Sequence, residues 1–265
     1  MRIFEIFDEE LHLSIGVLLY YDKAHTFIIE LQESLDEWTA PLLLTRFIRE
    51  KSYTIPRDIS FLWVKERIIP STRQNIGAIL STHKLSSYDE MKFLELSQGR
   101  CSQDSLYIRK IDALPDYVLK RREKNLLECV PLECPNILCF FSDNTVRKID
   151  LTNLTENEDI KKVMQNPDLF SSCSLGTGGY YITFNDSIDI YRDTLYNSGT
   201  IVPLTPVDFN IFVQKNVLDT TGVCDTLECS RQNLAYMVKQ NQLTPIKENV
   251  KGNLFLKGEV QKTCW

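Results

Sequence analysis

The sequence predicts a multidomain α+β fold, and three observations support this prediction. Strand-like apolar patterns occur near the N-terminus and again in the middle of the chain, with helical patterns between them. The length of 265 residues corresponds to two or three domains. A run of basic residues near position 120 and two prolines, Pro203 and Pro206, mark changes of composition at which domains can end.

These changes divide the chain into four predicted segments. We expect a mixed α/β N-terminal domain over 1–113, a basic connector over 114–126, a small α/β domain over 127–203 and a separate C-terminal domain over 214–265.

The N-terminal domain is predicted to open with three strands, over 1–8, 11–21 and 26–31. A helix should follow near Pro41, because an apolar stripe with helical spacing runs through the next segment. The stripe consists of Trp38, Leu42, Leu43 and Phe47. This helix is expected to bury the stripe against the strands.

Three further helices and a strand complete the predicted N-terminal domain. The helices are expected over 59–69, 73–83 and 89–98, and the strand over 105–111. Thr72 and Asp89 are predicted N-caps for the last two helices, because their side-chain oxygens can accept hydrogen bonds from backbone N–H groups of the first turn.

The middle domain is predicted as a β-β-α-β-β unit with one small sheet. Ser142-Asp143-Asn144 separates the first two strands, and Asn185-Asp186 separates the last two, as expected of tight hairpin turns. The intervening helix should end before Pro167. We expect the sheet to bury one face behind this helix.

The charge balance excludes a uniformly basic nucleic-acid coat but allows a local basic module. The chain holds 30 Lys and Arg against 36 Asp and Glu, a net charge of −6. The segment from Gln214 to Trp265 reverses this balance, with seven basic and five acidic residues.

Cysteine and histidine spacing indicates neither a metal site nor a cofactor. The eight cysteines form no C-x-x-C pair, and we expect reduced, partly buried thiols. The three histidines are far apart in sequence. The N-terminus carries acidic residues where a secretory signal would have its apolar core, and the longest apolar run is too short to span a bilayer. We therefore expect a cytoplasmic protein without membrane contact.

The sequence offers no complete set of catalytic residues, and we predict a protein that is not an enzyme. The glycines at 176–179 lack the Lys-Ser/Thr of a phosphate loop. Cys101 and Asp104 have no histidine nearby, and a structural loop in which Arg100 pairs with Asp104 explains them. Asp186, Asp189 and Asp193 need not converge, because a turn and a strand separate them.

The C-terminal domain has the pattern of two short helices joined by a tight turn. The first helix is predicted over 221–227, with Val223 and Leu227 facing inward, and Glu228-Cys229 forms the turn. Ser230 should cap the second helix, in which Leu234, Met237 and Val238 share one face. Arg231, Gln232 and Asn233 then occupy its exposed first turn.

Such a turn can present side chains to base edges in the major groove. Arg bonds guanine through two hydrogen bonds, and Gln or Asn bonds adenine in the same way. Two strands around Lys251-Gly252-Asn253 follow and would form a wing that contacts phosphates. The predicted DNA-binding residues are Ser230, Arg231, Gln232, Asn233, Tyr236, Lys239, Lys247, Lys251 and Asn253.

The C-terminal segment closely resembles the winged helix-turn-helix of excisionase and MerR-type regulators. The resemblance covers about 45 residues and depends on Ser-Arg-Gln-Asn-Leu at 230–234, the exit at 243–245 and the second wing strand with its following residues at 253–260. It implies a winged fold that binds double-stranded DNA.

Two other regions resemble bacterial families. The middle region is similar to small α/β domains of unknown function that accompany helix-turn-helix modules, which implies a regulatory setting and no catalytic residues. The N-terminal opening, 15–31 with Ala40-Pro41, is similar to the first subdomain of HipA-like kinases, whose catalytic set is missing here. The residues that carry the first likeness are Phe141-Ser142-Asp143-Asn144, Ile149-Asp150-Leu151, Phe170, Ile182-Thr183-Phe184, Asp189, Asp193 and Leu195-Tyr196.

The chain also contains an internal echo of its predicted recognition helix. Thr-Arg-Gln-Asn-Ile at 72–76 matches Ser-Arg-Gln-Asn-Leu at 230–234, and the residues before the two segments differ. The echo is explained by chance similarity of two short capped helices or by a second DNA-reading helix.

Two functions remain open from the sequence. The first is a sequence-specific DNA-binding regulator, either a transcriptional repressor or an antitoxin-like protein. We expect it to be a homodimer, because a single module binds weakly and paired half-sites need two copies. The alternative is a non-enzymatic adaptor, whose winged helix and acidic residues 1–203 dock a protein partner.

Overall fold

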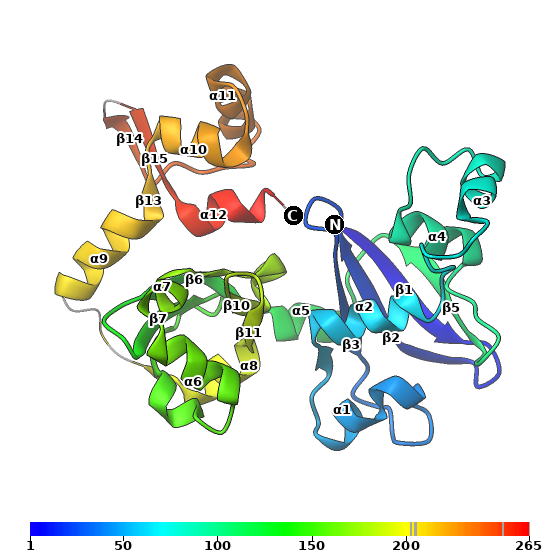
Figure 1. The fold of residues 1–265 in the computed structure, drawn as a ribbon. Coiled ribbons are helices and arrows are strands. Elements are labelled where there is room, and N and C mark those ends of the chain that lie inside the picture. The colour runs from blue at the N-terminus through cyan, green and yellow to red at the C-terminus, as the bar shows by residue number, and fades with distance from the viewer. Residues whose placement is uncertain (202, 204–205, 251, 265) are drawn as a thin grey trace. The chain divides into compact units, whose positions relative to one another are not determined.

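The computed structural model describes residues 1–201, 203, 206–250 and 252–264. The chain divides into two compact units, an N-terminal unit (Met1–Val118) and a C-terminal unit (Leu119–Trp265). Helices and antiparallel sheets are mixed along the chain, as Figure 1 shows, which confirms the predicted α+β class.

The N-terminal unit is built on a five-stranded antiparallel sheet with the order β4-β3-β2-β1-β5. All four strands predicted for this region are present, and the two-residue β4 was not predicted. Their bounds are Arg2–Asp8 (β1), Leu13–Tyr21 (β2), Thr26–Leu31 (β3), Thr54–Ile55 (β4) and Leu106–Ile111 (β5).

Five short helices accompany this sheet. They are the 3₁₀ helix η1 (Leu42–Leu44) and the α-helices α1 (Thr45–Arg49), α2 (Arg57–Lys65), α3 (Ile76–Thr82) and α4 (Glu90–Ser97). One apolar cluster joins the strands to α1, α2 and α4 through side chains such as Ile6, Leu18, Trp63 and Leu94. The core of the unit therefore lies where these three helices meet the strands.

The predicted apolar stripe of the first helix is wrong at Trp38 and Leu42, whereas Leu43 and Phe47 pack with the core as predicted. Trp38 and Leu42 are 92% and 93% exposed, whereas Phe47 is buried. The carboxylate of Asp36 closes a turn around Thr39, and the α-helix starts only at Thr45, after η1. Trp38 therefore lies outside any helix and outside the core.

The predicted cap of α4 is confirmed and that of α3 is wrong. Asp89 accepts a hydrogen bond from the backbone N–H of Lys92. Helix α3 starts three residues later than predicted, after Asn75, and among the described residues no side chain caps it. Thr72 instead lies in an exposed turn before the helix.

The basic connector contains helix α5 (Asp116–Arg122), which is followed by two antiparallel sheets. One has the order β12-β8-β7-β6, and the other has the order β11-β10-β9. Their strands are Leu126–Pro131 (β6), Asn136–Phe141 (β7), Val146–Asp150 (β8), Cys173–Leu175 (β9), Tyr181–Phe184 (β10), Ile188–Tyr191 (β11) and Thr200–Ile201 (β12).

The predicted single sheet of the middle region is therefore wrong. The four predicted strands are present, but they divide between the two sheets, because β6 and β9 supply additional partners outside the predicted pattern. The turns follow the prediction. Asn144, Asn185 and Asp186 all have positive φ, which these residue types tolerate well.

Helices on this region complete its apolar core. They are η2 (Leu151–Leu154), α6 (Glu158–Gln165), α7 (Pro167–Ser171), η3 (Thr177–Gly179) and α8 (Arg192–Ser198). Ile160 of α6 and Phe170 of α7 pack with Ile149 of one sheet and Ile182 of the other in a single cluster. The two sheets thus share one core.

The C-terminal segment forms a third small sheet with helices around it. The sheet has the order β13-β15-β14. Its elements are α9 (Pro206–Asn216), β13 (Val217–Leu218), α10 (Thr220–Leu227), α11 (Arg231–Lys239), β14 (Lys247–Val250), β15 (Gly252–Leu256) and α12 (Lys257–Lys262). Helix α9 starts at Pro206, where a domain boundary was predicted.

Candidate nucleic-acid interface

Helices α10 and α11 are joined by a tight turn whose backbone geometry is set locally. Glu228 ends α10 with φ +50°, and the N–H of Cys229 bonds the carbonyl of Cys224 at 3.0 Å. Ser230 is extended, and its Oγ accepts a hydrogen bond from the N–H of Asn233 at 3.2 Å. Helix α11 therefore begins at Arg231.

A compact apolar cluster holds α11 against α10, β15 and α12. Leu234 is the buried residue of α11, and it packs in one cluster with Val223 of α10 and Phe255 of β15. Leu243 and Val260 complete the buried set, while Met237 and Val238 pack at its edge. The inward face predicted for this helix is confirmed.

The predicted base-contacting residues lie in the exposed first turn of α11. Arg231, Gln232 and Asn233 are all exposed in its first turn. The guanidinium of Arg231 reaches back to the hydroxyl of Thr221 in α10, with Nη2 and Oγ1 3.4 Å apart. Tyr236 is 59% exposed. Ser230 is also exposed, but its side chain is committed to the cap.

The other predicted contacts divide between the end of α11 and the hairpin. Lys239 is exposed at the last turn of α11, and Lys247 is exposed at the start of β14. Asn253 is half-buried in β15, whereas the sequence suggested an exposed turn position. Lys251 lies outside the described residues. Gly252, with φ +116°, allows the reversal between the two strands.

The segment from 229 to 247 has an unusual charge composition for this chain. It contains no carboxylate, three basic residues and five side-chain amides, although the whole chain has a net charge of −6. The basic residues are Arg231, Lys239 and Lys247, and all three are exposed. Acidic residues flank the segment at Glu228 and Glu248. The exposed surface of α11 thus combines cations with amides that both donate and accept hydrogen bonds.

A buried carboxylate, which no sequence pattern predicted, anchors α12 to the sheet of β6. Glu128 of β6 is 4% exposed and accepts hydrogen bonds from the N–H groups of Gly258, at 2.5 Å, and Cys129, at 3.1 Å. Burial raises the pKa of Glu128, although both hydrogen bonds and the nearby Lys257 lower it. Glu128 therefore links α12 to β6.

The predicted pairing of Arg100 with Asp104 is wrong, because a buried arginine takes this role. Both oxygens of Asp104 bond Arg67, whose Nη1 also lies 2.9 Å from the sulfur of Cys101. Arg67 lies 4.0 Å from the ring centroid of Trp63, while Arg100 pairs with Glu9. The contacts described for Cys101 are those of a structural loop.

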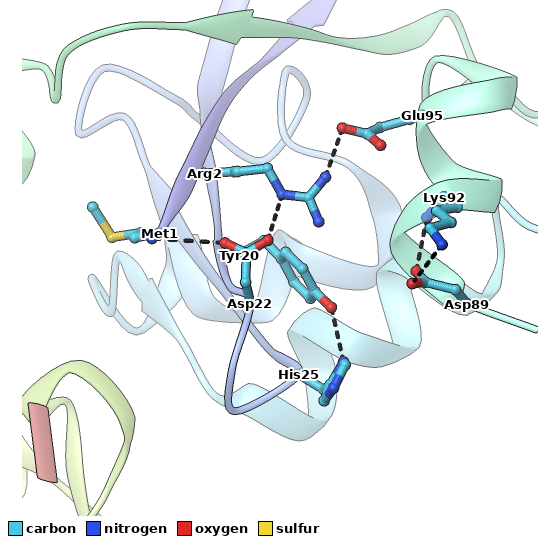
Figure 2. Close-up of polar contacts among 8 residues, drawn as sticks. All are labelled: Met1, Arg2, Tyr20, Asp22, His25, Asp89, Lys92 and Glu95. Carbon is cyan, nitrogen blue, oxygen red and sulfur yellow. Dashed lines mark hydrogen bonds and ion pairs between the residues drawn. The ribbon is translucent and has the colours of Figure 1, made fainter. Parts of the chain in front are cut away.

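A second polar cluster of the N-terminal unit ties α4 to the sheet. Figure 2 shows Arg2 between two carboxylates, with its guanidinium 2.7 Å from Asp22 and 2.8 Å from Glu95. Arg2 also lies 4.8 Å from the ring centroid of Tyr20, whose hydroxyl is 3.0 Å from Nδ1 of His25. Burial, followed by the charge of nearby Asp89, raises the pKa of Tyr20. The arrangement joins β1, β2 and α4.

The described part of the chain shows neither a cluster of metal ligands nor a membrane-spanning helix. No group of three or more His, Cys, Asp or Glu side chains there could hold a metal ion. None of the helices described is both long and apolar enough to cross a membrane.

The chain was compared with known families, curated proteins and solved structures, and none of the three comparisons found a match.

Proposed function

We propose that this protein is a sequence-specific DNA-binding regulator whose segment 214–265 acts as a winged helix-turn-helix. In this proposal α11 enters the major groove of double-stranded DNA, and the β14–β15 hairpin serves as the wing. The regulator is a repressor or an antitoxin-like protein, and it works without catalysis.

One observation carries the proposal: the first turn of α11 is capped, anchored and exposed at the same time. Ser230 caps the helix, Leu234 is buried in the core, and the three residues between them are exposed to solvent. A rigid first turn reduces the entropy lost when its side chains bind.

The side chains of this turn have the chemistry that base recognition needs. Arg231 can donate two hydrogen bonds to O6 and N7 of guanine, and Gln232 or Asn233 can pair with N6 and N7 of adenine. Lys239 and Lys247 are exposed cations suited to phosphates, which fix position and strengthen binding to any sequence.

The test begins with selection of duplexes from a random library by the full-length protein. Affinity for the selected duplex is then measured at two salt concentrations by fluorescence anisotropy. We expect affinity to fall steeply with salt, because bound phosphates release counterions. Arg231→Ala should weaken binding by about 1–3 kcal/mol, roughly 5- to 150-fold.

A matched control is present in the same chain. Arg73 is exposed and lies in the same Arg-Gln-Asn sequence, but it stands before a helix rather than inside one. Arg73→Ala should leave affinity for the selected duplex unchanged. Equal losses in the two variants, or selection of no duplex, would reject α11 as the reading helix and favour the protein-docking alternative.

A further inference from the structure

Three cysteine side chains gather in the core of the middle region. Cys129 of β6, Cys139 of β7 and Cys173 of β9 are buried in one apolar cluster, and all three are free thiols. The sulfur atoms of Cys129 and Cys173 lie 4.0 Å apart. Two thiols in contact differ from an isolated buried cysteine, because each is a partner with which the other can form a disulfide.

The two thiols in contact come from different sheets. Strand β6 is at the end of the order β12-β8-β7-β6, and β9 is at the end of the order β11-β10-β9. These two edge strands lie against each other. Cys129 and Cys173 are 44 positions apart in sequence. A disulfide between them would therefore join the two sheets covalently and close a long loop, which restricts the unfolded chain.

The surroundings of the two thiols differ in how they allow an oxidant to react. The thiol of Cys173, followed by burial, raises the pKa of Cys129 well above its ordinary value. A thiol that keeps its proton is a poor nucleophile. Cys173 directly follows two exposed serines and begins a strand of only three residues at the edge of its sheet. Such a short edge strand opens locally at a lower free-energy cost than the centre of a sheet, so we assign the first attack to Cys173.

We propose that Cys129 and Cys173 are a modification site, at which a peroxide oxidises the two thiols to a reversible disulfide. The thiolate of Cys173 attacks a peroxide oxygen, so that an S–O bond forms, the O–O bond breaks and hydroxide leaves. The thiol of Cys129 then attacks the sulfur of this sulfenic acid. The S–S bond forms, the S–O bond breaks, and the hydroxyl group leaves with the proton as water. In total two thiols and one hydrogen peroxide give one disulfide and two water molecules.

Cys139 is the matched comparison within the same core. It lies opposite Cys129 in the register of β6 and β7, and it is also buried. Its strand is central rather than at an edge, since β6 and β8 flank it. Burial raises the pKa of Cys139 well above its ordinary value. The proposal therefore requires a link from Cys129 to Cys173 and excludes a link from Cys129 to Cys139.

Peptide mapping of the full-length wild-type protein tests this choice of partner. The reduced, dilute protein is treated with hydrogen peroxide, alkylated, and cleaved after glutamate without a reducing agent. This cleavage releases 129–133 as a separate peptide, so that Cys129 is parted from Cys134 and Cys139. Mass spectrometry should find this peptide joined to that of Cys173, and dithiothreitol should separate the two. A link to Cys139, or no link once the exposed Cys134 is fully oxidised, would overturn the proposal.

Thermal melting of oxidised and reduced samples measures the effect of the link. Oxidation should raise the melting temperature of the wild-type protein by at least about 5 °C, because the disulfide closes a long loop. Cys139→Ala should keep this rise and Cys173→Ala should lose it. Each variant is compared with its own reduced form, so a loss of stability from the substitution itself does not enter the comparison. A rise as large in Cys173→Ala as in the wild type would assign it to another cysteine and overturn the proposal.

The mapping and the melting experiments both proceed without DNA. Their outcome is therefore independent of the proposed function, and failure of one proposal leaves the other in place. If Cys173→Ala does not fold, the peptide map of the wild-type protein still decides between the two partners of Cys129.

Discussion

Two segments of this molecule share nearly the same sequence and adopt different structures. Thr-Arg-Gln-Asn-Ile occupies 72–76, and Ser-Arg-Gln-Asn-Leu occupies 230–234. At 230–234 the helix starts at the arginine, with the serine as its cap. At 72–76 the helix starts only at the isoleucine, and the arginine, glutamine and asparagine form a turn before it.

Burial of the last residue distinguishes the two segments. Leu234 is 3% exposed in a cluster with α10, β15 and α12, whereas none of the described residues of α3 is fully buried. A helix of this length has little stability of its own, so packing decides where it starts. The comparison teaches that the Arg-Gln-Asn motif forms the first turn of a helix where a core lies behind it and a turn outside the helix where none does.

The largest difference in stability between the two segments should follow from replacing the apolar residue that ends each motif by alanine. Leu234→Ala leaves a cavity in a small core and should cost about 2–5 kcal/mol of unfolding free energy. Ile76→Ala should cost less than about 1 kcal/mol, because Ile76 is only half-buried. Hydrogen exchange of the α11 and α3 amides in the full-length protein measures both effects. Equal costs would show that the two helices are supported alike.

Adding a methyl group should lower stability at Gly258 of α12 and raise it at Gly77 of α3. A Cβ at Gly258 would lie 2.3 Å from the carbonyl oxygen of Leu127, so Gly258→Ala must displace α12 and should cost about 1–3 kcal/mol. A Cβ at Gly77 of α3 meets no described atom within 4 Å, so Gly77→Ala should stabilise α3 by about 0.5–1 kcal/mol.

Denaturant unfolding of the Gly258→Ala protein and hydrogen exchange in α3 of the Gly77→Ala protein check these signs. If Gly258→Ala left the free energy of unfolding unchanged, α12 would not be tightly held on β6. Destabilisation by Gly77→Ala would mean that α3 has a neighbour at this face.

The smallest difference in helix stability should come from replacing the hydroxyl residue that starts each motif, Ser230 or Thr72. Ser230→Ala removes a side-chain cap and should cost about 0.5–2 kcal/mol, seen as faster exchange in the first turn of α11. Thr72→Ala should change the stability of α3 by less than about 0.5 kcal/mol, because Thr72 is exposed and lies before the helix. A loss at Thr72 as large as that at Ser230 would contradict the assigned helix starts.

Most of the predictions that held concern local interactions, although the equally local Thr72 cap and Arg100–Asp104 pair were wrong. The cap of α4 by Asp89, the cap of α11 by Ser230 and the hairpin turn at Asn185-Asp186 are all present. Each depends on residues within four positions of one another, so a short window of sequence contains both partners. The inward face of α11 was predicted for the same reason, since helical spacing alone selects it.

Tertiary structure decided what local pattern could not. Trp38 and Leu42 have the spacing of a buried stripe but are exposed, since Trp38 lies in a turn closed by Asp36 and Leu42 in a separate 3₁₀ helix. Glu128 anchors Gly258 across 130 positions of sequence. Burial depends on which distant segments supply the neighbouring atoms. The sequence by itself therefore determined the caps of α4 and α11, the hairpin turns and the inward face of α11, because these depend on residues close together in the chain. Only the packed chain decided which of its two similar motifs became a supported, exposed helix start, because that depends on neighbours from distant segments.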